Sequence, residues 1–501
     1  MVKLITSSKK VSKMDTKELT KVQKDREEKL KKLRSEGFNF PNDFEKKDQI
    51  GDLIEKYNSL AKEKLEAKKV TVKTAGRIML KRVMGNAAFM TFEDSTGRIQ
   101  TYFSKDNLAE QLDSVKELDM GDIIGVEGVL FRTKTDELTV EVKKIRLLTK
   151  SLKPMPEKHK GLTDIETIYR QRYVDLMSNP ESRELFVKRN KIIQSLRKNL
   201  EEEGFLEVET PMMHPIPGGA NARPFETHHN ALDKQLFLRV APELYLKRLL
   251  VGGYEKVFEI NRNFRNEGIS TIHNPEFTML EFYEAYGDLN RTAKLIQKLV
   301  QDSVLAVNDS LNITYEDKPL NLEGDFRVVA LKDLVKEKLK LSSLDTEDEI
   351  FNAAKENKLK LHKSWGWGKV LLELFEAFVE KDLWEPTFVK DYPYEVSPLS
   401  RRKDDNEDYT DRMELFIAGR EFSNFFCELN DPHDQEQRFT DQVEQKKAGD
   451  NEAMFFDDDY INALQHGMPP AVGVGIGIDR LIMLATDRRS IRDVVFFPTL
   501  K

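Results

Sequence analysis

Acidic and aromatic residues alternate in a strand-like run near the middle of the chain, at 277–283. Because side chains on a strand alternate between faces, Phe277, Glu281 and Tyr283 share one face. Arg265 ends the preceding strand, and an arginine can grip a phosphate or a carboxylate with two parallel hydrogen bonds. The pattern predicts an anion clamp beside a ring that could stack on a base. A salt-bridged, exposed hairpin would show the same periodicity.

A second candidate lies in the stretch AVGVGIGIDRL. Gly473, Gly475 and Gly477 fall on one strand face and leave a flat slot where a planar ligand could lie. Asp479 is expected to cap the following helix, which would place the Arg480 guanidinium at the mouth of the slot. Tight packing of a strand against a helix would explain the glycines but not the arginine. The chain has no P-loop and no complete Rossmann glycine motif, so a nucleotide would bind in another manner.

The elements that must position these residues fall into two regions. The first has strand-like runs at 70–80, 86–94 and 98–104, a helix at 107–118, and strands at 121–131 and 137–148. This is the order of an OB-fold β-barrel, a common binder of single-stranded nucleic acid. The second mixes long helices and strands without βαβ alternation, which favours an α+β domain on an antiparallel sheet flanked by helices.

These boundaries predict four parts. They are an N-terminal helical extension at 1–68 with a helix at 15–36, the OB-fold at 69–150, a linker at 151–170, and the α+β domain at 171–501. Within the last part, a helix at 183–203 leads into a strand at 205–209.

Charge is distributed unevenly between these parts. The first 150 residues carry a net charge of +7 and the remaining 351 carry −14. A basic front on an acidic body fits a polyanion held by the front, although well-solvated lysine-rich helices would give the same balance. The single cysteine, the lack of a long apolar run and a polar start predict a cytoplasmic protein without membrane association.

Taken together, the segments around Arg265 and Arg480 and the helix–strand unit at 183–209 resemble the three signature motifs of class II aminoacyl-tRNA synthetases. The chain as a whole closely resembles the lysyl-tRNA synthetases of that class. The most specific stretches are PGGANARPF (217–225), APELYLKRL (241–249), FRNEG (264–268), HNPEFTMLEFY (273–283), CELND (427–431) and GIGIDR (475–480). The resemblance implies a homodimeric enzyme that activates L-lysine with ATP and loads it onto tRNA(Lys).

The resemblance also implies roles in binding ATP. Arg265 would hold the α-phosphate and the amino-acid carboxylate, and Phe277 would stack on adenine with Arg480 on its other face. Glu267 would read the adenine amino group, and His273 would reach the distal phosphates. Glu414 and Glu421 would bind Mg²⁺ that bridges the phosphates. Arg265 and Arg480 would be the catalytic residues, with no side-chain nucleophile. Ile272 departs from the Arg or Thr of many members, so no phosphate contact is assigned to it.

For lysine, the resemblance implies a pocket of acidic and polar groups. Glu243, near Gly219, would take the α-amino group, and Arg265 the carboxylate. Glu428 and Tyr283 would take the ε-ammonium, with Glu281 nearby and Asn424 and Phe426 along the stem. A strand period of two supports part of this set, since Asn424, Phe426 and Glu428 share a face. Phe425 stands where members have a smaller residue.

In the barrel, the resemblance assigns the anticodon contacts to Arg82, Phe89 and Gln100. A base stacked on Phe89 would contribute about 1–3 kcal/mol, and Gln100 could read a uracil edge. From its residue type alone, Phe89 would be placed in the core.

Three alternatives remain open at this point. An aspartate- or asparagine-charging synthetase would need a cation for the substrate side chain, where this pocket offers Glu281 and Glu428. A paralogue that transfers lysine to a protein would lack the barrel. A non-catalytic tRNA-binding relative would have lost some of the ATP residues.

Overall fold

The computed structural model describes residues 19–156, 162, 164–363, 365–447, 449 and 453–501. It divides into two compact units, Met1–Gly161 and Leu162–Lys501. The polar start of the chain and the first residues of the helix expected at 15–36 lie outside the described residues. No helix among the residues described is long and apolar enough to cross a membrane.

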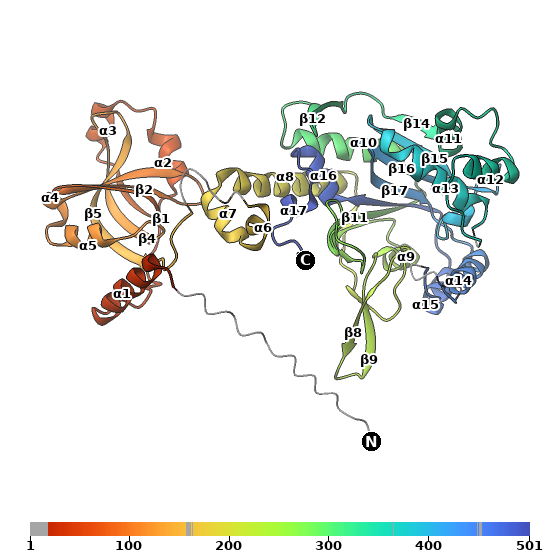
Figure 1. Ribbon diagram of the computed structural model, residues 1–501, viewed down its shortest axis with the longest axis horizontal. Coiled ribbons are helices and arrows are strands. Elements are labelled where there is room, and N and C mark those ends of the chain that lie inside the picture. Colours follow the sequence, from red (N-terminus) through yellow and green to blue (C-terminus); the bar gives the residue numbers. More distant parts are fainter. Residues whose placement is uncertain (1–18, 157–161, 163, 364, 448, 450–452) are drawn as a thin grey trace, which may run out of the picture. The chain divides into compact units, whose positions relative to one another are not determined.

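The first unit is a closed five-stranded barrel preceded by three helices (Figure 1). The helices are α1 (Lys21–Ser35), α2 (Ile50–Tyr57) and α3 (Lys62–Lys68). The barrel elements are β1 (Thr71–Met84), β2 (Ala87–Glu93), β3 (Arg98–Ser104), α4 (Lys105–Leu108), α5 (Gln111–Glu117), β4 (Ile123–Arg132) and β5 (Leu138–Thr149). The strands close in the order β1-β2-β3-β5-β4 around inward-facing apolar residues such as Met90, Phe92 and Phe103. The predicted OB-fold is confirmed.

One element of the barrel differs from its prediction. The helix expected at 107–118 is two short helices, α4 and α5, separated at Ala109. Ala109 has a φ of 44°, which a right-handed helix cannot contain. Its side chain carries no sign of this conformation, so the break was not visible in the sequence.

The second unit is built on an eight-stranded sheet in the order β14-β15-β16-β17-β18-β11-β10-β6. The strands are β14 (Arg327–Ala330), β15 (Thr387–Pro393), β16 (Tyr409–Ile417), β17 (Arg420–Cys427), β18 (Ala471–Gly477), β11 (Glu276–Ala285), β10 (Lys256–Phe264) and β6 (Leu206–Glu207). Neighbouring strands from β15 to β10 pair antiparallel, as predicted, whereas the two edge pairs, β14–β15 and β6–β10, are parallel. The sheet is therefore mixed, with an antiparallel centre.

Helices cover one face of this sheet and form its main core (Figure 1). Alternate residues of the central strands, such as Leu280, Phe282 and Ile476, pack there with α8 (Pro180–Glu202), α10 (Leu289–Leu305) and α16 (Ile478–Ala485). The helix α8 starts where the Asn179 side chain accepts a hydrogen bond from the Glu181 N–H, with Pro180 at its first position. The opposite side chains of the central strands are free to build a site.

The remaining elements surround this sheet. They are α6 (Ile165–Arg170), α7 (Arg172–Ser178), β7 (Met213–His214), β8 (Phe225–His229), β9 (Lys234–Leu238), α9 (Glu243–Val251), β12 (Asn312–Tyr315), β13 (Lys318–Asn321), α11 (Leu331–Leu339), α12 (Glu347–Glu356), α13 (Trp367–Phe378), η1 (Glu380–Asp382), η2 (Tyr394–Val396), α14 (Pro432–Lys447), α15 (Asp458–Gln465) and α17 (Ile491–Val494). The helix α6 begins inside the segment expected as a linker. Helices α11, α12 and α13 share a separate apolar core with β15.

Candidate active site

A cavity of about 390 Å³ opens on the sheet face that the main core leaves free. Alternate residues of β11 point into it, as the strand period predicts, and the three glycines of β18 form part of its wall. The cavity brings together thirteen of the fourteen residues proposed for ATP, lysine and metal. They are Gly219, Glu243, Arg265, Glu267, His273, Phe277, Glu281, Tyr283, Glu414, Glu421, Asn424, Phe426 and Arg480. The fourteenth, Glu428, lies behind the wall.

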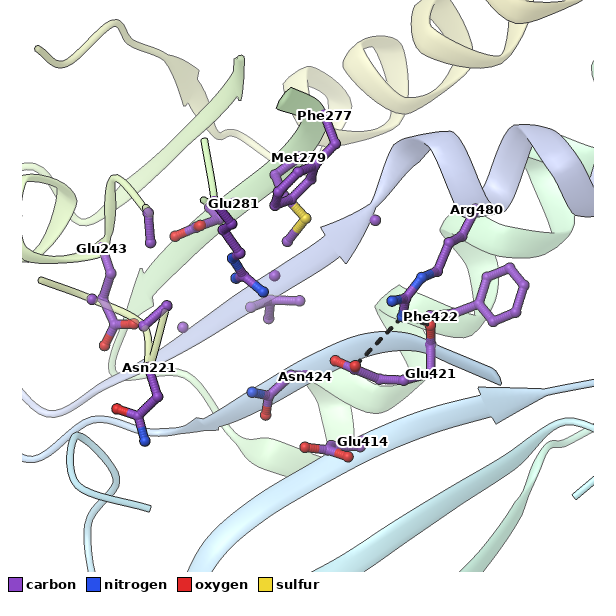
Figure 2. Close-up of a pocket in the computed structure, with 18 of the residues that line it drawn as sticks. Asn221, Glu243, Phe277, Met279, Glu281, Glu414, Glu421, Phe422, Asn424 and Arg480 are labelled. Atoms are coloured by element: carbon purple, nitrogen blue, oxygen red, sulfur yellow. Dashed lines mark hydrogen bonds and ion pairs between the residues drawn. The ribbon is translucent and has the colours of Figure 1, made fainter. Parts of the chain in front are cut away.

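One end of the cavity is cationic (Figure 2). The Arg265 guanidinium lies over the Phe277 ring, 5.2 Å from its centroid. Arg480 donates a hydrogen bond of 2.6 Å to the Glu421 backbone carbonyl and lies 3.5 Å from its carboxylate. Burial lowers the pKa of His273, and the nearby Arg480 adds to this effect. Two guanidiniums and an aromatic ring are suited to a nucleotide and its phosphates.

Two carboxylates, Glu414 and Glu421, lie beside this cationic end on neighbouring strands. The Tyr392 hydroxyl donates to Glu414 at 2.7 Å, and Arg412 pairs with it at 2.5 Å. Burial raises the pKa of Glu414, and the charge of Glu421 adds to this shift. Hard carboxylate oxygens are the ligands that Mg²⁺ prefers, and a divalent cation would relieve their repulsion. Among the described residues, no group of three or more His, Cys, Asp or Glu side chains is arranged to hold a metal ion.

A β-bulge lets Glu421 face the cavity. Glu421 and Asn424 are three apart in β17, so a regular strand would point them to opposite faces. The register shifts between Leu415, which pairs with Ser423, and Phe416, which pairs with Glu421. Phe422 is the extra residue of the bulge, and it reverses the alternation of side chains between the two faces of the sheet. Glu421 therefore faces the same cavity as Asn424 and Glu414.

The other end of the cavity is acidic. Glu243, Glu281 and Glu428, here called the acidic floor, come from α9, β11 and the residue after β17. Their exposed fractions are 6%, 6% and 1%. The Tyr283 hydroxyl donates to Glu281 at 3.1 Å. Burial, with help from the charge of Glu243, raises the pKa of Glu281 to about 8. Deeply buried carboxylates of this kind need a cationic partner.

Close backbone packing brings the acidic floor to the sheet. A Cβ atom at Gly473 would lie 2.0 Å from a Glu428 carboxylate oxygen and 2.4 Å from the Tyr283 ring. Gly219 has a φ of 88°, and a Cβ there would lie 2.9 Å from the Glu243 Cβ. Glycine is required at both positions, and at Gly219 the backbone conformation requires it as well.

The barrel carries its candidate residues on one outer surface. Arg82 pairs with Phe89 across β1 and β2, and Phe89 pairs with Tyr102 of β3. Phe89 is half-buried, and its ring lies 4.9 Å from that of Tyr102. Gln100 donates to Glu137 at 2.6 Å and accepts from Thr139 at 3.2 Å. Phe89 is therefore not a core residue, because its neighbours Ala88 and Met90 point inward in its place.

Comparison with known proteins identifies the family of each unit. Residues 164–501 match the family described as tRNA synthetases class II (D, K and N), and residues 72–148 match the OB-fold nucleic acid binding domain. The chain is 52% identical over 483 residues to a lysine–tRNA ligase of Neisseria gonorrhoeae, covering 95% of each chain. It is 53% identical over 481 residues to those of Idiomarina loihiensis and Nitrosomonas europaea, covering 95% of this chain and 96% of each relative. The chain belongs to the class II lysine–tRNA ligase family.

In this synthetase, sequence reasoning missed Lys247. Its side chain is fully buried on α9, and its ammonium lies 2.5 Å from Glu243 and also forms an ion pair with Glu428. Glu428 therefore has a partner within the chain and does not line the cavity itself. The signal was present, because residues four apart on a helix, such as Glu243 and Lys247, share a face.

The predicted role of Asp479 as a helix cap is wrong. The helix α16 begins at Ile478, so Asp479 lies inside its first turn. Its carboxylate accepts the Thr278 backbone N–H at 2.8 Å and pairs with Arg189 of α8 at 2.6 Å. Asp479 thus ties the third signature motif of the synthetase to the first two.

Phe425 does not line the cavity. Its ring is fully buried on the core side of β17 and meets Phe388 edge-on, with centroids 5.7 Å apart. Ile272, by contrast, does line the cavity near His273, where it presents an apolar side chain.

Proposed function

We propose that this chain activates L-lysine with ATP to form lysyl-adenylate and then transfers the lysyl group to the 3′ end of tRNA(Lys). One observation carries the proposal: a single cavity has a pair of guanidiniums at one end and the buried Glu243 and Glu281 at the other, with the buried Glu428 behind its wall. An amino acid with two ammonium groups and one carboxylate complements this arrangement, with its carboxylate toward the triphosphate.

Activation requires alignment more than a reactive side chain. Arg265 would hold the lysine carboxylate beside the α-phosphate, so that a carboxylate oxygen attacks the α-phosphorus and pyrophosphate leaves. The adenine would stack on Phe277, and Arg480 would pack on the other face of the adenine. The hydrogen bond from Arg480 to the Glu421 carbonyl would hold the guanidinium in this position. Glu267 and His273 would contact the adenine amino group and the distal phosphates. Arg265 and Arg480 would balance the charge that develops on the phosphate oxygens.

Magnesium would be held by Glu414 and Glu421. When bound, it would supply a positive charge shared between ATP phosphate oxygens. The pairing of Glu414 with Arg412 and Tyr392 supports this role by fixing the carboxylate toward the cavity.

Lysine would lie along β11 and β17. Its α-amino group would meet Glu243 near Gly219, and its ε-ammonium would reach Tyr283 and Glu428, with Glu281 nearby. Asn424 and Phe426 would flank the stem. Leaving one of these buried carboxylates without its cation costs about 3–5 kcal/mol, so neutral amino acids would be rejected. An aspartate side chain would meet the acidic floor, which disfavours the aspartyl- and asparaginyl-type alternative.

The remaining parts support delivery of tRNA. We assign the anticodon contacts to Arg82, Phe89 and Gln100. We divide the chain into an N-terminal helical extension (1–68), the OB-fold (69–150), a linker (151–170) and the catalytic domain (171–501). A homodimer is supported by exposed apolar residues on α8 and the edge strand β6, with Val187 56% and Leu206 49% exposed. A cytoplasmic location fits the single free cysteine, Cys427.

The test is ATP–pyrophosphate exchange with single amino acids. L-lysine alone should drive exchange, because the acidic floor needs two ammonium groups. Exchange driven by aspartate or asparagine would contradict the proposal. No exchange with any amino acid, alongside tight tRNA binding, would favour a non-catalytic relative.

A further inference from the structure

Lys247 is a buried cation that none of the roles above uses. It lies on α9 with no exposed surface, and its ammonium contacts Glu243 and Glu428 together. The ammonium also lies 5.5 Å from the centroid of the Phe426 ring, which lines the cavity. Lys247 thus contacts residues proposed for both ends of the lysine site, and it does not itself line the cavity.

Lys247 neutralises only part of the negative charge of the acidic floor. The acidic floor holds three carboxylates, and Lys247 is the cation that contacts two of them. The two arginines that influence Glu281 and Glu243 electrostatically have partners of their own, because Arg239 pairs with Glu259 at 2.7 Å and Arg412 with Glu414 at 2.5 Å. With its carboxylates ionised, the floor lacks two positive charges.

L-lysine brings two ammonium groups to this floor, while its carboxylate goes to Arg265. We propose that Lys247 is a positioning residue that keeps Glu243 and Glu428 ionised and oriented. With Lys247 in place, the acidic floor lacks two positive charges, which equals the number of ammonium groups that the substrate brings. The inference rests on the proposed function and adds a specificity-determining residue to it.

The surroundings of Lys247 explain why its charge matters. Glu243 on the same helix, Glu428 after β17 and the Tyr460 hydroxyl of α15 all influence Lys247 electrostatically. Glu281 and Tyr283 of β11 in turn influence Glu428. The neighbouring carboxylates raise the pKa of Lys247 against the effect of burial. Without this cation, the buried carboxylates would take up protons and lose the orientation that the ion pairs impose. They would then be poor partners for an incoming ammonium.

The first test is Lys247→Met in the full-length chain, assayed by lysine-dependent ATP–pyrophosphate exchange. The KM for lysine should rise roughly 30-fold or more, the scale expected for truncating one partner of a buried charge pair. The KM for ATP should stay within about twofold, because Lys247 contacts no residue of the cationic end. A lower KM for lysine would overturn the proposal, since it would mean that Lys247 merely repels the substrate.

Lys150→Met is the matched control. Lys150 is another deeply buried lysine held by two carboxylates, with Asp122 at 2.8 Å and Asp119 at 2.5 Å, but it lies in the barrel unit. Its loss should lower the melting temperature and leave the KM for lysine unchanged. Equal effects of the two variants on the KM for lysine would mean that Lys247 acts only through stability.

Chemical rescue covers the case in which Lys247→Met folds poorly. The Lys247→Ala variant is purified and assayed in the presence of n-propylammonium, which supplies the carbon atoms and the charge that the substitution removes. The added cation should lower the variant's KM for lysine, whereas n-propanol should not, and the unsubstituted enzyme should show only inhibition. Rescue by propanol as well would reduce Lys247 to a space filler and refute the proposal. If the unsubstituted enzyme itself shows no lysine-dependent exchange, the proposed function fails instead.

Discussion

Gly473 allows the acidic floor to sit directly against the sheet. Because an added Cβ would lie 2.0 Å from Glu428 and 2.4 Å from Tyr283, Gly473→Ala must push both side chains away. A misplacement of about 1 Å can cost roughly 100-fold in rate, so we expect a loss of that size in kcat/KM for lysine-dependent exchange.

Gly475→Ala is the control for this prediction. The nearest atom to its added Cβ is the end of the Met279 side chain at 3.2 Å, which is flexible enough to yield. We expect less than a tenfold change in kcat/KM. A similar loss in both variants would show that the sheet itself, and not the acidic floor, is disturbed.

Glu281 should make lysine binding depend on pH. Its pKa is raised to about 8 by burial and by Glu243, whereas the unfolded chain has an ordinary carboxyl. At pH values between the pKa of Glu281 in the unfolded chain and its pKa in the folded protein, the folded protein holds a proton that the unfolded chain has lost. The contribution of Glu281 to the free energy of unfolding therefore falls as pH rises toward 8. Lysine favours the ionised form, so binding should tighten over the same range by up to about tenfold per pH unit.

Calorimetric titration with lysine at pH 6, 7 and 8 measures this slope. Binding at pH 7 should release protons, which buffers of different ionisation enthalpy reveal. Glu281→Gln should flatten the profile, because the other two carboxylates of the acidic floor are paired with Lys247. An unchanged slope in that variant would remove Glu281 from the titration.

At the scale of elements, a change on the proposed anticodon surface of the barrel should affect tRNA recognition and not lysine activation. Phe89→Ala removes a half-buried ring that stands beside Tyr102. The loss of one stacked base is worth about 1–3 kcal/mol, so the KM for tRNA should rise about 5- to 150-fold. Lysine-dependent exchange should be unchanged. Phe103→Ala, in the barrel core, should instead unfold the barrel at lower temperature.

Elements also show where sequence reasoning reaches its limit. The faces of β11 followed from a period of two, which placed Phe277, Glu281 and Tyr283 in one cavity. The position of Glu421 did not, because its phase depends on the bulge at Phe422. The interruption at Ala109 is equally invisible, because nothing in an alanine side chain marks a positive φ, and the partners of Asp479 are invisible because Thr278 is distant from it in sequence. Local periodicity is readable, and tertiary hydrogen bonds are not.

For the whole molecule, the two compact units predict separable activities. Each unit has its own apolar core, and the cavity is lined entirely by residues of the second. A fragment starting at Leu162 should therefore retain lysine-dependent exchange within about threefold, because no lining residue is lost. Its tRNA charging should fall at least as far as that of Phe89→Ala. A fragment without exchange activity would show that the cavity depends on the barrel.

Asp479 connects the helix of the proposed dimer interface to the proposed ATP site. Its carboxylate holds Thr278 of β11 and Arg189 of α8, while the next residue in the chain is Arg480. The same helix α8 carries the exposed Val187. Subunit association would thus affect the position of Arg480, which we propose stacks on adenine, through α8 and the Asp479 carboxylate. On dilution into monomers, ATP affinity should weaken in step with the sedimentation coefficient, and Arg189→Met should uncouple the two.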